Sequence, residues 1–420
     1  MRLKIFYGWL VVFSMFMTLL VHAGAGFYVF GIFYKPLAEE FGWDLASISL
    51  AMTVYLLTLG LTAPIMGRLT DRFGEKTVIS AGALIAGTGL FLLSRTTSLG
   101  EFYFLYFLVG LGFSGCGVIP ASSAVTNWFA KKRGIAIGIA MAGVSVGAFI
   151  ITLAAGYIMA GNGWRFTYCF LGILSLVLVI PLVLLGMKNT PQEIGLLPDG
   201  GPLPHGEGTG RVTPKTSCIA DLEGWTAGMA IRNQPFWLIV IGFFLIFFSI
   251  GAVLQHEVNY LTDRGISRLV AASALAFTGG FGGLGKISFG YLADRVSPKN
   301  VAILSFAMQA AGIIILIFAT SMTSFWAFAF IFGFAMGGQI ALQPLIIADL
   351  FGLASFGTIY GIVTLAAASG TALGPVLAGL VYDLSGSYFW VFWSCAATSL
   401  GATILVFLAR RPTLDKEMAR

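Results

Sequence analysis

Charged side chains are scarce in this chain, since Asp, Glu, Lys and Arg make up 10% of its 420 residues. A soluble globular protein carries about 25% of them. Histidine and cysteine are also few, with 3 and 4 residues, and the cysteines are not at metal-ligand spacing. No nucleophile–base pair, metal cluster or phosphate-binding loop is recognisable in the sequence. We therefore expect that the protein is not an enzyme and uses no cofactor or metal.

Hydrophobic residues are abundant and make up 58% of the chain. A spanning helix needs about 20 mostly apolar residues. Twelve runs fit, near 7–34, 45–67, 77–94, 101–127, 133–159, 165–187, 233–260, 268–291, 300–319, 325–348, 356–381 and 387–409. The first is too long for a signal peptide. The sequence predicts an all-α membrane protein with twelve transmembrane helices, in contact with the lipid bilayer.

The positive charge follows the predicted topology. If both termini are cytoplasmic, 18 of the 24 Lys and Arg residues lie inside and five, including Lys35, lie outside. Cytoplasmic loops carry this excess in membrane proteins. The net charge of +6 is thus explained without a nucleic-acid partner. The sequence contains no N-x-S/T sequon, which favours a bacterial source and a cell inner membrane.

Residues 188–232 form the only long polar interval, rich in Pro and Gly, and we interpret them as a cytoplasmic linker. Six runs precede this interval and six follow it. The predicted organisation is an N-terminal six-helix half (1–187), the linker (188–232) and a C-terminal six-helix half (233–420). His205 lies in the linker and is expected to be solvated.

The two halves repeat each other. The stretch "GRLTDRFG" from Gly67 recurs as "GYLADRVS" from Gly290, at an offset of 223 residues. The same offset aligns Gly42 with Gly265, and "RGIAIG" with "FGTIYG" further along the chain. Parallel six-helix repeats are typical of secondary transporters.

The repeated stretches carry an Asp-Arg pair in each half: Asp71 with Arg72, and Asp294 with Arg295. A carboxylate at this membrane surface can interact with the N-terminus of another helix and favour its dipole. We expect these four residues to form a gate that holds one conformation. The alternative is a charged turn that only fixes topology.

Longer stretches resemble a known family. "GRLTDRFGEK" resembles the signature loop of the major facilitator superfamily. "NWFAKKRGIAIGIA", "NGWRFTYCFLG", "PQEIGLLPDG", "HEVNYLTDRGIS" and "SGTALGPVLAGLVYDLSGSY" are similar to the branch of oxalate/formate antiporters and monocarboxylate transporters. The resemblance implies the major facilitator fold, a small organic anion as the substrate, protons as a second partner and a monomeric protein.

Departures from related branches narrow this expectation. Drug/proton antiporters of the superfamily have an Arg in the fourth span where this chain has Tyr106. Their fifth span has a Pro where this chain has Ala148. The resemblance therefore implies transport of something other than drugs.

Lys286 is the only Lys or Arg within an apolar run, four residues before Gly290. Monocarboxylate transporters place an Arg there, so the resemblance implies an anion-binding role for Lys286. Animal members also carry an Asp where this chain has Gly282. Oxalate antiporters have a second cation where this chain has Ala367. A single cation suits a monoanion better than a dianion.

Snorkelling is the alternative for Lys286, because its side chain is one helical turn from the predicted cytoplasmic end. The glycines before it, Gly279, Gly280, Gly282, Gly283 and Gly285, are expected to leave open space for a ligand. An intramembrane cation is costly and is by default a functional hypothesis.

Other candidates have equally plain alternatives. His22 could donate to a carboxylate or carry a proton, or be hydrogen-bonded within the structure. Gln339 and Gln343 share one helical face and could bind the substrate or a neighbouring helix. His256 and Glu257 are expected to line an outer vestibule, with an accessory gating role as the alternative. Tyr28 and Tyr360 could line the substrate site.

These observations predict a secondary transporter that moves a small organic monoanion, most plausibly a monocarboxylate, by alternating access. Antiport and proton-coupled symport both remain open. The alternatives are a transporter or exporter of a larger aromatic or sugar acid, and, in a different class, an anion channel or membrane receptor.

Overall fold

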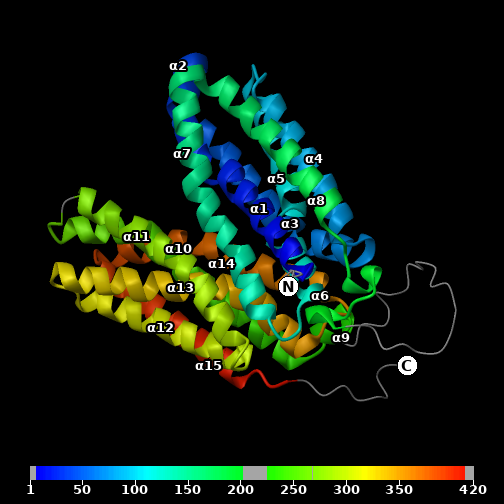
Figure 1. The fold of residues 1–420 in the computed structure, drawn as a ribbon. Helices are drawn as coiled ribbons and strands as arrows, with labels where there is room; N and C mark the ends of the chain where they lie inside the picture. Colours follow the sequence, from blue (N-terminus) through cyan, green and yellow to red (C-terminus); the bar gives the residue numbers. More distant parts are fainter. Residues whose placement is uncertain (1–5, 202–224, 267, 412–420) are drawn as a thin grey trace, which may run out of the picture. The chain divides into compact units, whose positions relative to one another are not determined.

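The computed structural model describes residues 6–201, 225–266 and 268–411, and most of them are helical. The chain divides into two compact units, residues 1–221 and 222–420, each described here by itself. In the N-terminal half the helices are α1 (Gly8–Gly26), α2 (Tyr34–Phe41), α3 (Leu45–Phe73), α4 (Glu75–Leu93), α5 (Leu99–Gly115), α6 (Val118–Trp128), α7 (Arg133–Leu174) and α8 (Ile180–Gly186) (Figure 1). Shorter helical turns are η1 (Tyr28–Phe33), η2 (Ser175–Val179), η3 (Pro191–Ile194) and η4 (Pro198–Gly200).

The C-terminal half is helical in the same way (Figure 1). Its helices are α9 (Ala227–Ile231), α10 (Gln234–Asp263), α11 (Arg268–Ala293), α12 (Pro298–Phe318), α13 (Met322–Phe351), α14 (Phe356–Ser385) and α15 (Tyr388–Leu408).

Ten helical segments of the described residues are long and apolar enough to span a membrane. One of these, Arg133–Gly186, is 54 residues long and contains two spans that meet at Gly163, whose φ of 79° breaks the helix. Helix α11, which follows a residue outside the described ranges, supplies the remaining span. The prediction of twelve helices in two repeats is confirmed, and the orientation of the termini remains a prediction.

Glycines with positive φ mark the repeat in the backbone. Gly42 and Gly265, which the 223-residue offset pairs, have φ of 66° and 81° after the first span of each half. The same offset pairs Gly163 (φ 79°) with Gly386 (φ 64°). Glycine adopts this left-handed conformation at little cost. Each half therefore turns its chain at the same places.

Close contacts between helix backbones hold each half together. A Cβ added at Gly147 of α7 would clash with the carbonyl oxygen of Leu20 on α1. A Cβ at Gly370 of α14 would clash with the carbonyl oxygen of Phe244 on α10. Small residues let membrane helices approach in this way. The first and fifth spans thus pack alike in both halves.

The first part of the predicted linker is folded against the N-terminal half. Asn189 Oδ1 accepts a hydrogen bond from the amide of Lys76 at 2.9 Å. Asp199 Oδ2 accepts from the amides of Ala130 and Lys131, at 3.1 and 2.8 Å. Burial and the nearby Glu193 carboxylate raise the pKa of Tyr7, whose hydroxyl donates to the Gly186 carbonyl. Residues 188–201 therefore hold two loops of the N-terminal half in place, one at Lys76 and one at Ala130 and Lys131. Residues 202–224, with His205, lie outside the described residues.

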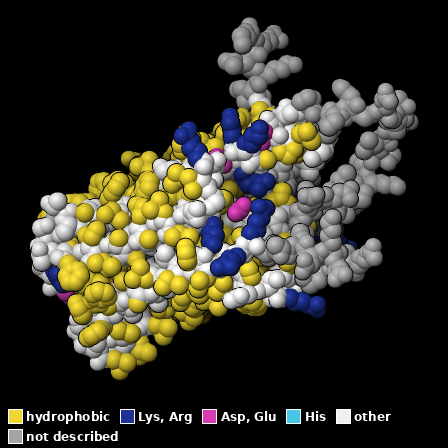
Figure 2. Space-filling model, turned by 90° about the horizontal axis from the view of Figure 1, so that it is seen from below, with side chains coloured by type: hydrophobic (Ala, Val, Ile, Leu, Met, Phe, Trp, Pro, Cys, Tyr) yellow, Lys and Arg dark blue, Asp and Glu magenta, His cyan; other side chains and the backbone are white. Residues whose placement is uncertain are grey.

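The surface is dominated by apolar side chains. Large residues such as Leu185 and Leu384 are 85% and 81% exposed. Figure 2 shows broad hydrophobic areas, with Lys and Arg side chains gathered in one region of the view. Apolar exposure on this scale marks an interaction surface rather than a water-facing one, and here it suits contact with lipid.

Candidate functional site

Lys286 lies on α11, near its C-terminal end, and its side chain is only 4% exposed. The ammonium therefore does not reach water in this structure, contrary to the snorkelling alternative. Gly285, next to it, lies against the Phe334 carbonyl of α13, with no room for a Cβ. Helix α11 is thus pressed onto α13 immediately beside the lysine.

The glycines before Lys286 have two different roles. Gly279 and Gly280 are exposed, and no atom lies within 4 Å of a Cβ added at either, so both lie at the surface and the expected space for a ligand stays a prediction. The expectation of open space is wrong for Gly282 and Gly285, which pack against α13: Gly282 meets Met336 Cε at 3.5 Å. Gly279 is seven residues before Lys286 and hence on the same helical face. Lys286 is nevertheless buried, so the exposure at Gly279 does not extend along this face as far as the lysine.

Gln339 belongs to a buried polar network in the C-terminal half. Its Nε2 donates to Gln309 Oε1 on α12 at 2.7 Å. Gln309 Nε2 in turn donates to the Ile246 carbonyl at 3.2 Å and lies within 3.3 and 3.4 Å of the Ser249 and Ser399 hydroxyls. The Ser399 hydroxyl donates to Ser249 at 2.9 Å. This network ties α10, α12, α13 and α15 together, which favours the neighbouring-helix alternative for Gln339.

Gln343 and Tyr360 are both buried, at 4% and 0% exposure. Among the described residues, Gln343 Nε2 has no hydrogen-bond partner. The Tyr360 ring lies 5.7 Å from that of Phe356 on α14. The two glutamines that were expected to bind the substrate or a neighbouring helix thus differ in their contacts. Between them, Gln339 alone donates its amide hydrogens to a described partner.

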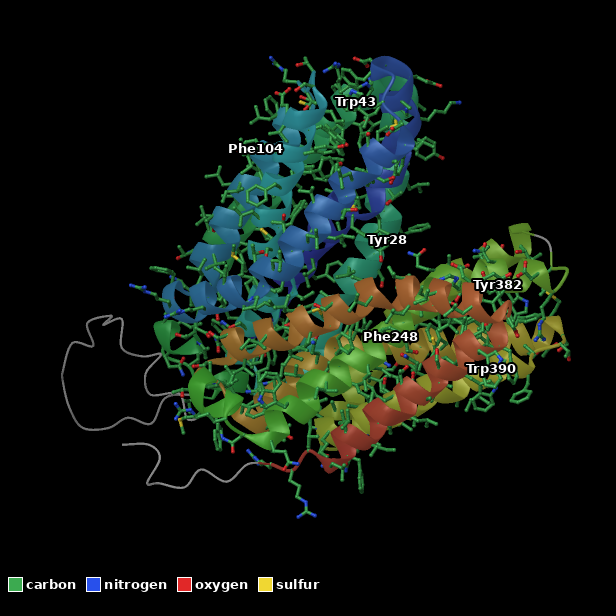
Figure 3. The ribbon with its side chains drawn as sticks, turned by 180° about the vertical axis from the view of Figure 1, so that it is seen from behind. Tyr28, Trp43, Phe104, Phe248, Tyr382 and Trp390 are labelled. Carbon is green, nitrogen blue, oxygen red and sulfur yellow. The ribbon has the colours of Figure 1, made fainter. Side chains whose placement is uncertain are left out.

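His22 lies midway along α1, half-buried, with its ring 5.3 Å from that of Phe113 on α5. Its Nδ1 has no hydrogen-bond partner within the described ranges. Tyr28 on η1 is 46% exposed (Figure 3), and its ring meets that of Phe27 edge-on, at 5.1 Å. Both residues remain available to a ligand, and their roles stay proposals.

Tyr106, at the position of the drug antiporters' Arg, is paired inside the N-terminal half. Its hydroxyl lies 2.8 Å from that of Tyr168 on α7. The ring of Tyr168 stacks on Phe33 at 3.8 Å. This position therefore joins helices of one half.

His256 and Glu257, expected to line a vestibule, are placed differently from one another. His256 is half-buried, and its Nε2 donates to the Pro375 carbonyl of α14 at 3.1 Å. Glu257 is 0% exposed. The vestibule expectation is therefore not met at Glu257, because its position on α10 turns the side chain into the helix bundle.

The gate candidates lie at helix ends, as expected. Asp71 and Arg72 are in the last turn of α3, and the Arg72 guanidinium is 5.1 Å from the Phe73 ring. Asp294 and Arg295 directly follow α11, and the Arg295 guanidinium is 4.5 Å from the Tyr291 ring. Each half therefore holds its arginine on an aromatic ring beside the aspartate.

Two polar clusters were missed in the sequence. Glu75 starts α4 and is 4% exposed, and its Oε1 accepts from Ser123 at 2.6 Å and from Asn127 at 2.9 Å. Gln309 anchors the network described above. In each case a lone polar residue in or beside an apolar run was the available signal.

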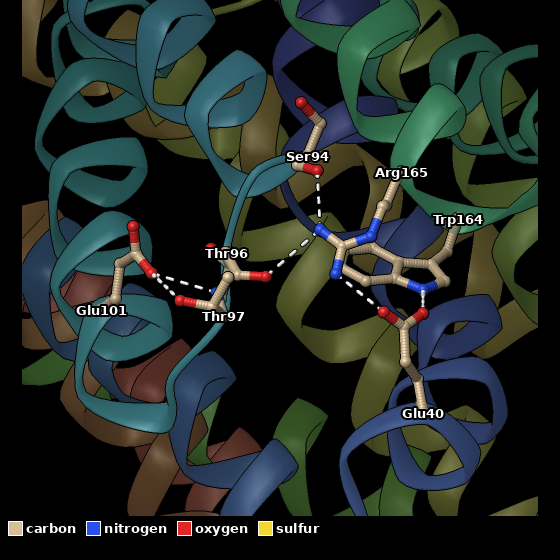
Figure 4. Close-up of polar contacts among 7 residues, drawn as sticks. All are labelled: Glu40, Ser94, Thr96, Thr97, Glu101, Trp164 and Arg165. Carbon is tan, nitrogen blue, oxygen red and sulfur yellow. Dashed lines mark hydrogen bonds and ion pairs between the residues drawn. The ribbon is translucent and has the colours of Figure 1, made fainter.

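Arg165 joins three segments at the end of the N-terminal half where α7 turns at Gly163 (Figure 4). Its guanidinium donates to Glu40 at 2.7 Å and to the carbonyls of Ser94 and Thr96 at 3.0 and 3.2 Å. Trp164 also donates to Glu40, at 2.6 Å. The side chains of this cluster bind one another, so we interpret it as a structural contact between segments rather than a binding site.

Taken together, two repeated six-helix bundles with a cation buried inside a span define a polytopic membrane transporter. The family profile described as Major Facilitator Superfamily matches residues 15–288 and 257–418. The chain belongs to this superfamily, as the sequence predicted.

Similar proteins agree with this assignment. Human monocarboxylate transporter 12 is 26% identical over 96% of this chain and 80% of its own length. The uncharacterised MFS-type transporter YcxA of Bacillus subtilis is 25% identical over 93% of this chain and 92% of its own. The crystal structure of the transporter FucP in the outward conformation superposes with a TM-score of 0.74 at 15% identity, over 96% of this chain and 99% of that one. The monocarboxylate branch is thus represented among the relatives, and the structural likeness confirms the fold.

Proposed function

We propose that this protein moves a small organic monoanion, a monocarboxylate, across the cell membrane by alternating access. It works as a monomer, in the inner membrane of a bacterial cell. Substrate exchange or proton coupling supplies the energy. The protein's similarity to monocarboxylate transporters supports the substrate class.

The observation that carries the proposal is the burial of Lys286 within a spanning helix. A cation at the centre of a membrane helix costs about 2.5–3.5 kcal/mol on insertion scales, which is an upper bound for Lys286 near the C-terminal end of α11. The 4% exposure of this side chain means that water does not offset this cost. A carboxylate in this setting gains attraction that water would have screened.

A bound monoanion would bring one negative charge beside the lysine, while a dianion would bring a second charge into an apolar region. His22 and Gln343 are the further groups proposed to contact the substrate. Each has a buried ring or amide nitrogen without a partner among the described residues.

The test is counterflow of a labelled short-chain monocarboxylate in proteoliposomes. We expect Lys286→Gln to reduce exchange at least tenfold, because the neutral amide no longer attracts the anion. Lys286→Arg should retain part of the activity, since it keeps the charge in a differently shaped group. Lys35→Gln is the matched control, because Lys35 is an exposed lysine on α2. Normal exchange by a well-folded Lys286→Gln protein would disprove the role.

Counterflow also tests the channel alternative. A transporter exchanges labelled substrate against an opposing gradient of unlabelled substrate, and a channel does not. A screen of larger aromatic and sugar acids by thermal shift would identify the substrate class independently, because a ligand that binds the folded state raises its melting temperature.

A further inference from the structure

Among the described residues of the C-terminal half, Glu257 is buried like Lys286 but has no part in the anion site proposed above. Its side chain is 0% exposed on α10. Neither carboxyl oxygen has a hydrogen-bond partner within the described part of the chain. A buried polar group without a partner is rare and calls for an explanation.

The surroundings of Glu257 are apolar. Val253, Tyr260 and Leu261 lie one turn away on the same side of α10. All three belong to one hydrophobic cluster that continues on α12 and α13 through Ile313, Leu316, Phe328 and Phe332. An ionised carboxylate would be costly there.

Two things can offset that cost: a cation or a proton. Glu257 lies near the C-terminal end of α10, and the neighbouring helices carry few ionisable groups at that level. These are Arg268 on α11, Tyr382 and Asp383 on α14, and Tyr388 and Cys395 on α15. Helices α12 and α13 have none there. The side chain of Arg268 lies outside the described residues.

The other groups on α10 and in its following loop have contacts of their own. The Arg264 guanidinium donates to the carbonyls of Ala319 and Ile317, and lies 4.8 Å from the Tyr260 ring. Tyr260 donates to the Leu316 carbonyl at 3.1 Å. His256 is held by Pro375 through its Nε2. None of these contacts involves Glu257.

We propose that Glu257 is a proton-binding site that couples proton movement to transport. Its carboxylate takes a proton from water when the site opens, forming an O–H bond. The same proton returns to water when the site opens again, and that bond breaks. In its buried position the carboxyl group is neutral, which is compatible with its apolar cluster. This proposal rests on the transport function proposed above and adds its coupling ion.

An infrared difference spectrum tests the site without any substrate. A protonated carboxyl group has a C=O stretching band that an ionised carboxylate lacks. At pH 7 we expect this band in the native protein and its loss in Glu257→Gln. The other buried glutamate, Glu75, is present in both proteins and cancels. Absence of the band from the difference spectrum would overturn the proposal.

Transport separates coupling from binding. In proteoliposomes, Glu257→Gln should retain counterflow when the pH is equal on both sides. Substrate accumulation driven by an imposed proton gradient should fall at least tenfold. Asp263→Asn, an exposed carboxylate on the same helix, is the control and should keep both activities. Gradient-driven accumulation by Glu257→Gln at the native level would contradict the proposal.

Two outcomes distinguish the remaining explanations. If Arg268→Gln and Glu257→Gln lower the melting temperature equally and the infrared band is missing, Glu257 is an ion-pair partner and the proposal is wrong. A Glu257→Gln protein that no longer folds contradicts it too, since the amide copies the neutral acid in size and charge. If the native protein shows no counterflow but does show the band, the transport proposal fails and the proton site stands.

Discussion

The two halves have the same helices but place their polar residues differently. At the repeat offset of 223 residues, polar groups in the C-terminal half correspond to small or apolar ones in the N-terminal half. The pairs are Lys286 with Ala63, Gln309 with Ala86, and Gln339 with Cys116.

The N-terminal half keeps its buried or paired charges at helix ends instead. Glu75 begins α4 and is bonded to Ser123 and Asn127, and Arg165 is paired with Glu40 beside the turn at Gly163. A carboxylate at a helix N-terminus is favoured by the unpaired amides and the dipole there. Glu257, inside α10, has no such support. The two halves therefore share their helix–helix backbone contacts but differ in their buried polar residues. Lys286, Gln309 and Gln339 lie inside helices of the C-terminal half, at positions where the N-terminal half has small or apolar residues.

The largest expected effect on stability is at Gln309. Replacing it in Gln309→Leu removes the donor to the Ile246 carbonyl and the acceptor of Gln339, which leaves buried groups unsatisfied. We expect a loss of about 2–3 kcal/mol, the cost of stranding such groups. Thermal unfolding in detergent measures it.

The double variant Gln309→Leu/Gln339→Leu is the control for this prediction. Because the two residues share a hydrogen bond, the combined loss should be smaller than the sum of the single losses. Additive losses would mean that the two glutamines do not act as one network. The contrast between the buried polar residues of the two halves would then be weaker.

The gate residues should behave alike in the two halves, because Asp71 and Asp294 occupy equivalent positions. We expect Asp71→Asn and Asp294→Asn each to shift the conformational balance toward the inward-open form by about 1–2 kcal/mol, a typical coupling energy. The reactivity of a cysteine introduced at the exposed Gln255 would report the shift, once the native cysteines are replaced.

The control for the gate is Asp383→Asn, which changes an exposed carboxylate on α14 and should leave this reactivity unchanged. A response to only one of the two gate variants would show that the halves have diverged here as well. No response to either would rule out the gate.

The smallest effect is expected at Glu75. The variant Glu75→Gln keeps an acceptor oxygen for Ser123 or Asn127 but weakens bonds that a charged acceptor strengthens. We expect about 1 kcal/mol of lost stability in thermal unfolding. Glu257→Gln should lose none, because it has no described hydrogen bond to lose. An equal loss of stability in both variants would mean that the hydrogen bonds of Glu75 do not distinguish it from Glu257, which has none among the described residues.

Some of the candidate site could be read from the sequence. Lys286 is visible as the one Lys or Arg in an apolar run, and it is buried in the structure, while its anion-binding role stays a prediction. Asp294 follows its helix as predicted, whereas Asp71 lies inside α3, which continues past the predicted run 45–67. The burial of Glu257 was not, because its place near a helix end was equally compatible with a wet surface. The folding of residues 188–201 was missed, since Pro, Gly, Asn and Asp are common both in linkers and in compact turns.

The sequence by itself determined the number of the spans, the repeat and the family, because apolar runs of membrane length and repeated glycines are local signals. The limits of the helices needed the structure: the run predicted at 45–67 continues to Phe73 in α3, and the run at 101–127 is divided into α5 and α6. Only the tertiary structure decided which polar side chains face each other. Helices such as α13 are apolar on nearly every side, so their sequence carries little periodicity to show which face packs inward. That Gln339 meets Gln309 while Glu257 meets an apolar cluster is decided by helix packing, because each contact joins residues far apart along the chain.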